Sequence, residues 1–389
     1  MNQPDTLTEQ LNRFQQRALV VGGIGILLLA IGAFVSKEEF FQSYLYGYLF
    51  WMILTLGCLG ILLLHHLVSG SWGHIVQRHM EAGARIMPVM AILFIPILLG
   101  LHTLYPWTNH EHLTHVVEQK LGYLNIPFFL ARQVIYFGLW ITSAFYLSNK
   151  SRELDKSGDL LVVRKLRIFS GPAMALFILS VTLASVDWMM SLEPEWFSSM
   201  YGIGRITNAA LTGIALCILL VRFFADKKPL SDVLTTRHIH HLGNLLMAFT
   251  IFWAYIVFSE FLIIWSGNLP DDNMWHLRRM GHGWVVMAAI LIAGQFALPF
   301  AILLSKRVKR KIQTLARIAA WIFLIRFIDL YWLIFPAFDG DKVQFHWLAL
   351  VSPIAIGGIW MWFFIGNLKT QPLLPLNDPR FHNGMAEQH

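Results

Sequence analysis

The stretch RFIDLYWLIFP, residues 326–336, places an arginine and an aspartate at the end of a long apolar run. Arg326 and Asp329 are three residues apart, so a helix would put them on one face, where they can pair. A charge inside a membrane span is costly and nearly always faces a partner or a water-filled cavity. The stretch therefore predicts a membrane-spanning helix with a functional polar face.

The composition is typical of an integral membrane protein. Of the 389 residues, 56% are hydrophobic and only 14% are charged, whereas soluble domains have roughly 25% charged residues. The mean hydropathy is +0.55. A net charge of +7 is expected when Lys and Arg gather in cytoplasmic loops, so a nucleic-acid partner is excluded.

Ten apolar runs are long enough to cross a bilayer, which takes about 20 residues. The fold class is therefore an all-α integral membrane protein with about ten transmembrane helices. The predicted spans are 18–35, 44–65, 84–105, 126–147, 166–190, 206–225, 242–265, 284–304, 315–335 and 345–366.

Spans 2–5 and 6–9 look like two copies of one four-helix unit. Asp187 and Asp329 are each followed, seven residues later, by a proline that closes the span. A further pattern repeats at a constant offset of 158 residues, in which Phe94, His102, Leu104 and Trp107 match Phe252, Glu260, Leu262 and Trp265. We expect two four-helix bundles, 44–190 and 206–335, flanked by single helices at 18–35 and 345–366.

Positive charges predict the orientation of the chain. Of the 30 Lys and Arg residues, 22 lie on the side that carries both termini, six lie on the other side, and two lie inside spans. This bias places both termini in the cytoplasm. Residues 1–17 would then be a cytoplasmic N-terminal segment, and 367–389 a cytoplasmic tail that is disordered or extended along a neighbouring protein.

Six ionisable residues lie at similar depth within the spans and form the candidate site. They are Asp187, Glu260, Asp329, Arg132, Arg326 and His102. Counting residues at a rise of about 1.5 Å places them in the half of the membrane away from the termini. We expect the acids and arginines to meet there in one hydrated pocket, and we find no buried ionisable group in the other half.

Two interpretations of these charges stay open. Carboxylates in a low-dielectric environment can take up and release protons near neutral pH, which would suit a proton relay or a quinol pocket. Alternatively, Arg–Asp pairs simply hold helices together. Glu260 favours a functional role, because no basic residue adjoins it on its own helix.

Motifs for a bound cofactor are missing from the sequence. The segment TNHEHLTHVVEQ, residues 108–119, resembles a zinc site but lacks the HExxH spacing. His65 and His66 end the second span, where we expect them to contact lipid headgroups. No CxxCH occurs, and two cysteines are too few for an iron–sulfur cluster. We therefore expect no metal and no cofactor in this chain.

Three strings carry a resemblance to a known family. They are SVDWMMSLEPEWFSSMYG at 185–202, FWAYIVFSEFLIIWSGNLP at 252–270, and RFIDLYWLIFP at 326–336. They resemble the ActF membrane subunits of alternative complex III, within the NrfD or polysulfide-reductase membrane-subunit superfamily. The resemblance covers essentially the whole chain, and it implies two four-helix bundles flanked by single helices.

The resemblance also implies a function. Alternative complex III is a bacterial quinol:electron-acceptor oxidoreductase in the cytoplasmic membrane, and its ActF subunit is regarded as non-catalytic and cofactor-free. The partners implied are an NrfD-like sister subunit thought to bind quinol, and periplasmic subunits with iron–sulfur clusters and haem c. A proton path through the bundle would involve Asp187, Glu260, Arg326 and Asp329, whereas His102 and Arg132 are included by depth alone.

Two alternatives remain. In the first, this chain is itself the quinol-binding NrfD-like subunit, with His102 or Asp187 accepting the proton. In the second, it is a secondary transporter. The sequence does not favour a transporter, because no Gly/Pro-broken pair of spans occurs in matching halves.

Overall fold

The computed structural model describes residues 5–109, 113–281, 283–340, 342–375 and 377–380. This described part is helical throughout, with no strand, and contains ten helices long and apolar enough to cross a membrane. They are Leu7–Val35, Lys37–Val68, Ser71–Leu99, Ile126–Ser157, Leu160–Leu192, Tyr201–Phe224, Thr236–Gly267, Trp284–Leu303, Ile312–Asp339 and Leu348–Lys369. The predicted fold class of a ten-helix membrane protein is confirmed.

The first half of the chain contains α1 (Asp5–Val35), α2 (Lys37–Val68), α3 (Ser71–Ala84), α4 (Met87–Leu93), α5 (Ile95–Leu99), α6 (Leu101–Leu104), η1 (Pro106–Thr108), α7 (His115–Lys120), α8 (Ile126–Ser157), α9 (Leu160–Trp188) and η3 (Met190–Leu192). The second half contains α10 (Tyr201–Phe224), α11 (Leu230–Val233), α12 (Thr236–Gly267), α13 (Pro270–Arg278), α14 (Trp284–Leu291), η4 (Ile292–Ala297), α15 (Leu298–Leu303), α16 (Lys306–Lys309), α17 (Ile312–Ile334), α18 (Pro336–Asp339) and α19 (Leu348–Lys369).

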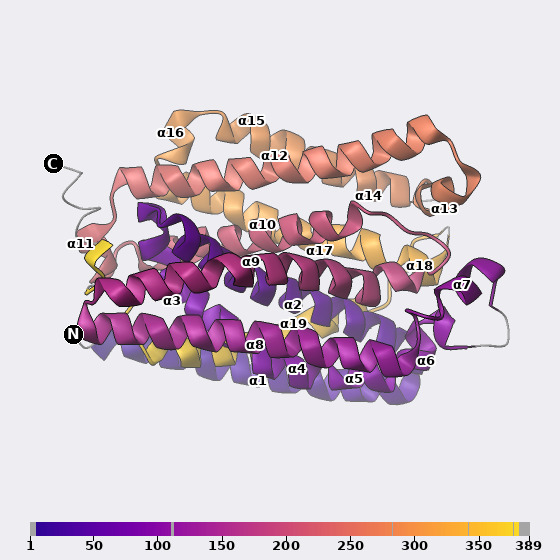
Figure 1. The fold of residues 1–389 in the computed structure, drawn as a ribbon, viewed down its shortest axis with the longest axis horizontal. Coiled ribbons are helices and arrows are strands. Elements are labelled where there is room, and N and C mark those ends of the chain that lie inside the picture. Colours follow the sequence, from indigo (N-terminus) through magenta and orange to yellow (C-terminus); the bar gives the residue numbers. More distant parts are fainter. Residues whose placement is uncertain (1–4, 110–112, 282, 341, 376, 381–389) are drawn as a thin grey trace.

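The long helices run side by side, and both chain ends lie at the same end of the assembly (Figure 1). We call this end the terminal side and the opposite end the distal side. In the first half, α2 packs against α3 and α9, while α8 packs against α9 and α4. In the second half, α10 packs against α12 and α17, while α14 contacts α17 and α15 contacts α12. Contacts of α2 with α10 join the halves, and α1 pairs with α19.

Small residues bring these helices close together. A Cβ atom added to Gly57 of α2 would lie 2.1 Å from the carbonyl oxygen of Ala209 in α10. A Cβ added to Gly358 of α19 would lie 2.4 Å from the backbone nitrogen of Gly22 in α1. Because lipid tails are as apolar as Leu, such close backbone packing contributes much of the attraction between membrane helices.

The third span differs from its predicted boundaries of 84–105, because it begins at Ser71 and is divided into three helices, α3, α4 and α5, before it ends at Leu99. The helix tightens at Phe94, which leaves the carbonyls of Met90 and Leu93 without their regular helical partners. Tyr48 and Tyr44 of α2 donate hydrogen bonds to these carbonyls, at 3.1 and 2.8 Å. A broken helix is tolerated in a membrane when neighbours satisfy the freed backbone groups in this way.

Candidate functional site

Asp187 lies on α9 and is fully buried. Arg132 of α8 binds it with two parallel hydrogen bonds, from Nε to Oδ2 and from Nη2 to Oδ1, both 2.9 Å long. The Tyr136 hydroxyl donates to Oδ2 at 3.0 Å, and the Gln133 amide approaches the same oxygen at 3.4 Å. The carboxylate is thus held by a bidentate pair, the strongest geometry for an arginine and an acid.

The guanidinium of Arg132 is enclosed as well. It donates from Nη1 to the carbonyl oxygen of Tyr123 at 2.9 Å. The aromatic rings of Tyr123 and Phe128 cover it, with centroids 3.8 and 4.5 Å away. This arrangement ties α8 to α9, and it matches the structural interpretation of an Arg–Asp pair more closely than an open proton relay.

Asp329 and Arg326 pair within α17, as their spacing predicts. Nη1 of Arg326 lies 2.9 Å from Oδ2 of Asp329, and both side chains are buried. Asn208 of α10 approaches the same oxygen at 3.4 Å, while Arg326 donates to Gln295 Oε1 at 3.2 Å. Three buried polar atoms of this cluster, Arg326 Nε, Asn208 Oδ1 and Gln295 Nε2, have no hydrogen-bond partner in the part of the chain that the structure describes.

Gln295 reaches Arg326 from a π-helical segment, η4, in the eighth span. Pro299 lacks an N–H, so it cannot close the i→i+5 bond to the carbonyl of Gly294. The indole of Trp321 donates to that carbonyl instead, at 2.8 Å. Single π turns are rare and occur frequently at functional sites. The Arg326–Asp329 cluster therefore adjoins a π-helical segment and contains unpaired polar atoms.

Glu260 lies on α12 and is half-buried. The Ser198 hydroxyl donates a short hydrogen bond to its carboxylate. Arg205 of α10 is close enough for its charge to act on both Glu260 and Arg326. Arg205 is thus a charged neighbour of both Glu260 and Arg326.

Arg205 is one of the six positive residues that the sequence assigned to the side away from the termini, but its side chain on α10 is buried. Among the described residues its Nε and Nη1 atoms have no hydrogen-bond partner, and its guanidinium lies over the ring of Tyr201 at 4.9 Å. Although no basic residue adjoins Glu260 on its own helix, a neighbouring helix supplies one.

The six predicted residues do not form one pocket. His102 lies on α6 with its side chain exposed, so it does not join the buried acids. Among the described residues, no hydrogen bond or ion pair joins the Asp187–Arg132 pair to the Asp329–Arg326 cluster. Asp187 belongs to the first half of the chain and Glu260 and Asp329 to the second, and the contacts of the described residues give each of the two Arg–Asp pairs its own partners.

The terminal half of the membrane holds a buried polar network that sequence reasoning missed. Its members include buried side chains from α2, α3 and α8, namely His65, His74, Gln77, Arg78, Glu81 and Ser151. His66 and His79 are buried on the same helices. The sequence predicted that His65 and His66 contact lipid headgroups, but both side chains are buried within the protein. The expectation that this half lacks buried ionisable groups is also wrong.

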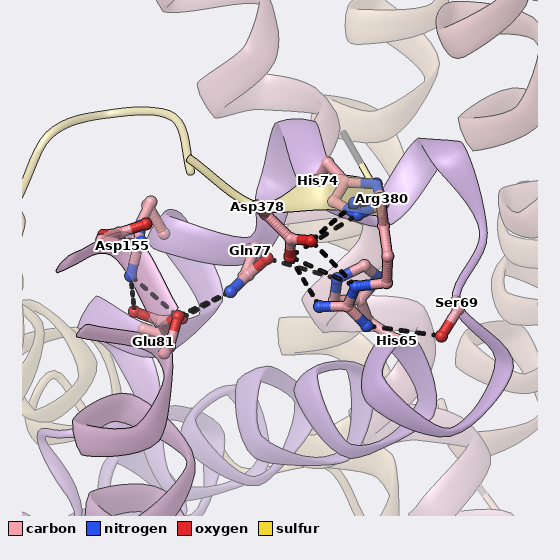
Figure 2. A network of polar contacts seen from close by, with 10 residues as sticks. His65, Ser69, His74, Gln77, Glu81, Asp155, Asp378 and Arg380 are labelled. Atoms are coloured by element: carbon pink, nitrogen blue, oxygen red, sulfur yellow. Dashed lines mark hydrogen bonds and ion pairs between the residues drawn. The ribbon is translucent and has the colours of Figure 1, made fainter. Parts of the chain in front are cut away.

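Gln77 is the centre of the network, as Figure 2 shows. Its side-chain oxygen lies 3.3 Å from Nε2 of His65. Its amide nitrogen donates to Glu81 at 3.0 Å and to the Ser151 hydroxyl at 2.7 Å. Within the described residues, the buried nitrogens of His66 and Nδ1 of His65 have no hydrogen-bond partner. Gln77 thus links imidazole to carboxylate across α2, α3 and α8.

Arg78 connects the network to neighbouring segments. Its guanidinium donates to Glu81 at 2.8 Å and Ser151 at 2.9 Å, and it forms a short ion pair with Asp155 of α8. It also donates to Gln371 in the C-terminal segment at 2.9 Å. The buried guanidinium of Arg78 therefore binds two carboxylates and also a side chain of the C-terminal segment.

The C-terminal segment closes this network from the terminal side. Asp378 is fully buried, 3.9 Å from His74, and paired with Arg380 at 2.7 Å (Figure 2). Burial alone would raise the pKa of the Asp378 carboxyl, but hydrogen bonds and charge from Arg380 hold the pKa below its usual value. Asn377 donates to the carbonyl of Asp155 at 2.7 Å. Gln371, Asn377 and Asp378 of the predicted cytoplasmic tail thus pack on their own chain, whereas residues 381–389 of that tail lie outside the described residues.

A helical period in the sequence could have revealed this network. His74, Gln77, Arg78 and Glu81 have spacings of three and four residues, so they share one helix face. Because these residues lower the local hydropathy, the third span was predicted to begin only at residue 84. A polar face directly before an apolar run is also compatible with an exposed amphipathic helix, and only packing against α2 and α8 decides between the two.

Other histidines do not extend either site. His110 and His112 of the TNHEHLTHVVEQ segment lie outside the described residues. Within the described part, no group of three or more His, Cys, Asp or Glu side chains is arranged to hold a metal ion. Neither a scan against protein-family models nor a search of curated proteins found a match to this chain.

Proposed function

We propose that this chain is a cofactor-free integral membrane subunit of a respiratory quinol:electron-acceptor oxidoreductase of the alternative complex III type. It would support assembly of the complex and conduct protons through its buried carboxylates. The observation that carries the proton role is the presence of buried ionisable groups at both ends of the helical assembly. Intramembrane ionisable residues commonly belong to ion or proton pathways.

The terminal and distal sides of the helical assembly contain different groups that could carry a proton. On the terminal side, His65, Gln77 and Glu81 form a hydrogen-bonded chain with unpaired imidazole nitrogens. On the distal side, Glu260 and the Arg326–Asp329 pair adjoin buried polar atoms without protein partners. Buried polar atoms usually bind a protein group or an ordered water, so water can complete each half of the path. The enclosed Asp187–Arg132 pair is better suited to a structural role.

The distal surface supports the role in assembly. Glu193 accepts hydrogen bonds from Arg278 at 2.7 Å and Arg279 at 2.8 Å, which fixes α13 to the segment after α9. The rings of Trp196 and Trp275 stack there, with centroids 4.8 Å apart. Large apolar side chains nevertheless remain exposed on these segments, namely Phe197, Met274, Leu277 and Met280. Exposed apolar side chains on segments held in place by ion pairs and ring stacking are typical of a surface that binds a partner protein.

The alternative of a secondary transporter is less well supported. The third span is broken at Phe94, whereas its counterpart in a four-span repeat is α12, an unbroken helix over Thr236–Gly267. Transporters of the broken-helix kind carry such interruptions at corresponding positions of both halves. The eighth span has a π segment, but its counterpart α8 is regular over Ile126–Ser157.

Purification in a mild detergent tests the proposed function. The tagged chain should be recovered together with partners that show a c-type haem spectrum and quinol-oxidising activity. Replacing Phe197 and Leu277 with serine should lower recovery of these partners several-fold, because the change removes apolar area from the distal surface. The matched control is Leu161→Ser, which changes an exposed leucine near the terminal side.

Two results would contradict the proposal. Recovery of the wild-type chain alone, without haem or quinol oxidation, would argue against a respiratory complex. If partners are recovered but respond equally to the distal and the terminal-side substitutions, the distal surface is not where they dock.

A further inference from the structure

A large apolar groove lies between α1 and α10. Its volume is about 740 Å³, and α1, α2, α10, α17 and α19 all contribute to its wall. Several lining side chains remain partly exposed, including Phe14, Val21 and Ile354, so the groove is open to the membrane. We call it the α1–α10 groove.

The groove results from how α1 is attached. Gly22 and Gly358 bring α1 against α19, and α19 in turn packs on α2. Toward the terminal side, α1 also approaches α10. Phe14 meets Phe223 edge-on there, with ring centroids 5.8 Å apart. Lys227 donates to Gln10 at 2.9 Å just beyond these rings.

The lining offers almost no free polar group. The Tyr46 hydroxyl already donates to the carbonyl of Phe327 at 3.0 Å, and the Trp51 indole donates to the carbonyl of Pro353 at 2.7 Å. Arg17 is the one charged residue among the described residues that line the groove, and it is exposed. A quinone ring would find no donor within the apolar part of the groove, whereas a hydrocarbon chain needs none.

The terminal-side mouth of the groove is basic. Arg17 has no hydrogen bond or ion pair among the described residues, and Arg13 lies one turn earlier on α1. Lys227 stands on the α10 side, and Arg222 is already paired with Asp226 at 3.0 Å. Basic pockets between membrane helices favour anionic lipid headgroups. The groove thus has basic residues at its terminal-side mouth and an apolar lining beyond them. A phospholipid has the same order, with an anionic headgroup followed by acyl chains.

The length of the groove agrees with this order. Gln15, close to Arg17 on α1, donates a hydrogen bond to the carbonyl of Trp362 in α19. From that level the α19 side of the groove continues to Ala349, which is about 20 Å along a helix axis. One leaflet takes half of a hydrocarbon core about 30 Å thick, so the groove has room for an acyl chain of that leaflet.

We infer that the α1–α10 groove is a binding site for an anionic phospholipid of the terminal-side leaflet. One acyl chain lies in the groove, and the phosphate lies between Arg17 and Lys227. This inference does not depend on the proposed respiratory function, because it requires only that the chain spans a membrane.

Lipid retention by the purified protein tests the site. The protein is delipidated, placed in nanodiscs of phosphatidylethanolamine with or without phosphatidylglycerol, and analysed for bound lipid by native mass spectrometry. Replacing Arg17 and Lys227 with glutamine should weaken retention of phosphatidylglycerol roughly thirtyfold, given about 1 kcal/mol for each basic residue near the surface. Retention of phosphatidylethanolamine should change little.

Two further variants separate the groove from general surface charge. Arg164→Gln with Lys165→Gln removes two exposed charges from α9 on the terminal side, and it should leave phosphatidylglycerol retention unchanged. Ala18→Phe fills the groove without changing charge, and it should displace the lipid. Melting temperatures confirm that each variant is folded.

Three outcomes would overturn the inference. Equal losses in the Arg17/Lys227 and Arg164/Lys165 variants would show attraction to surface charge only. Full retention in Ala18→Phe would place the acyl chain elsewhere. Quinone in place of phospholipid, bound in the wild type and lost in Ala18→Phe, would assign the groove to a different ligand.

Discussion

Replacing Arg132 with methionine should destabilise the protein by about 3–5 kcal/mol, the range measured when one partner of a buried ion pair is removed. Asp187 is fully buried and receives two hydrogen bonds from Arg132. The variant would leave this carboxylate with only Tyr136 and the more distant Gln133. Denaturant unfolding in mixed micelles, followed by tryptophan fluorescence, measures the change.

A double variant shows whether the loss comes from the unpaired charge. Arg132→Met with Asp187→Leu removes both charges, and it should recover much of the stability lost in Arg132→Met. Arg164→Met is the matched control, because it removes an exposed arginine from the neighbouring helix α9. An unchanged midpoint in Arg132→Met would mean that the pair does not hold α8 to α9.

Replacing Arg78 with glutamine should have a comparable effect on the terminal side. Arg78 is the shared partner of Glu81, Asp155 and Gln371, so its loss leaves a buried acid without a counter-charge. We expect a loss of about 3 kcal/mol or more, together with release of the C-terminal segment. Hydrogen exchange and limited proteolysis of residues 371–380 would both become faster.

A nearby arginine provides the control for this variant. Arg152 reaches Thr370 at 3.3 Å through an exposed contact, so Arg152→Gln should leave protection of the segment nearly unchanged. If the segment is equally protected in Arg78→Gln, the Arg78–Gln371 contact does not hold it. The contacts of Asp378 and Arg380 would then be sufficient.

The sequence predicted the helices well because apolar length is a local property. All ten spans occur, and the pairing of Arg326 with Asp329 follows from their spacing of three residues. The start of the third span was predicted too late in the sequence, because the polar residues on one face of α3 lower the hydropathy although they are buried. Pro88 and Pro96 in this span mark where helices α4 and α5 begin.

The arrangement of the site depends on helix rotation and helix partners, which the sequence does not contain. His102 and the buried acids have similar depth, but His102 points outward. Asp187 and Asp329 are also similar in depth, yet they lie in different halves of the fold. Arg205 was placed outside the membrane because it lies near the start of α10, although that first turn is already buried. The sequence predicts which ionisable residues have similar depth in the membrane. The packing of the helices decides which of these side chains contact one another.

The most direct test of the account counts protons. The proposed quinol-oxidising complex is reconstituted in liposomes, and protons translocated per electron are measured for the wild type, Glu260→Gln on the distal side and Glu81→Gln on the terminal side. Glutamine keeps the shape and hydrogen-bonding capacity of each side chain but cannot release a proton. If buried carboxylates conduct the protons, both variants should oxidise quinol while translocating clearly fewer protons per electron. An unchanged ratio in both variants would contradict the account.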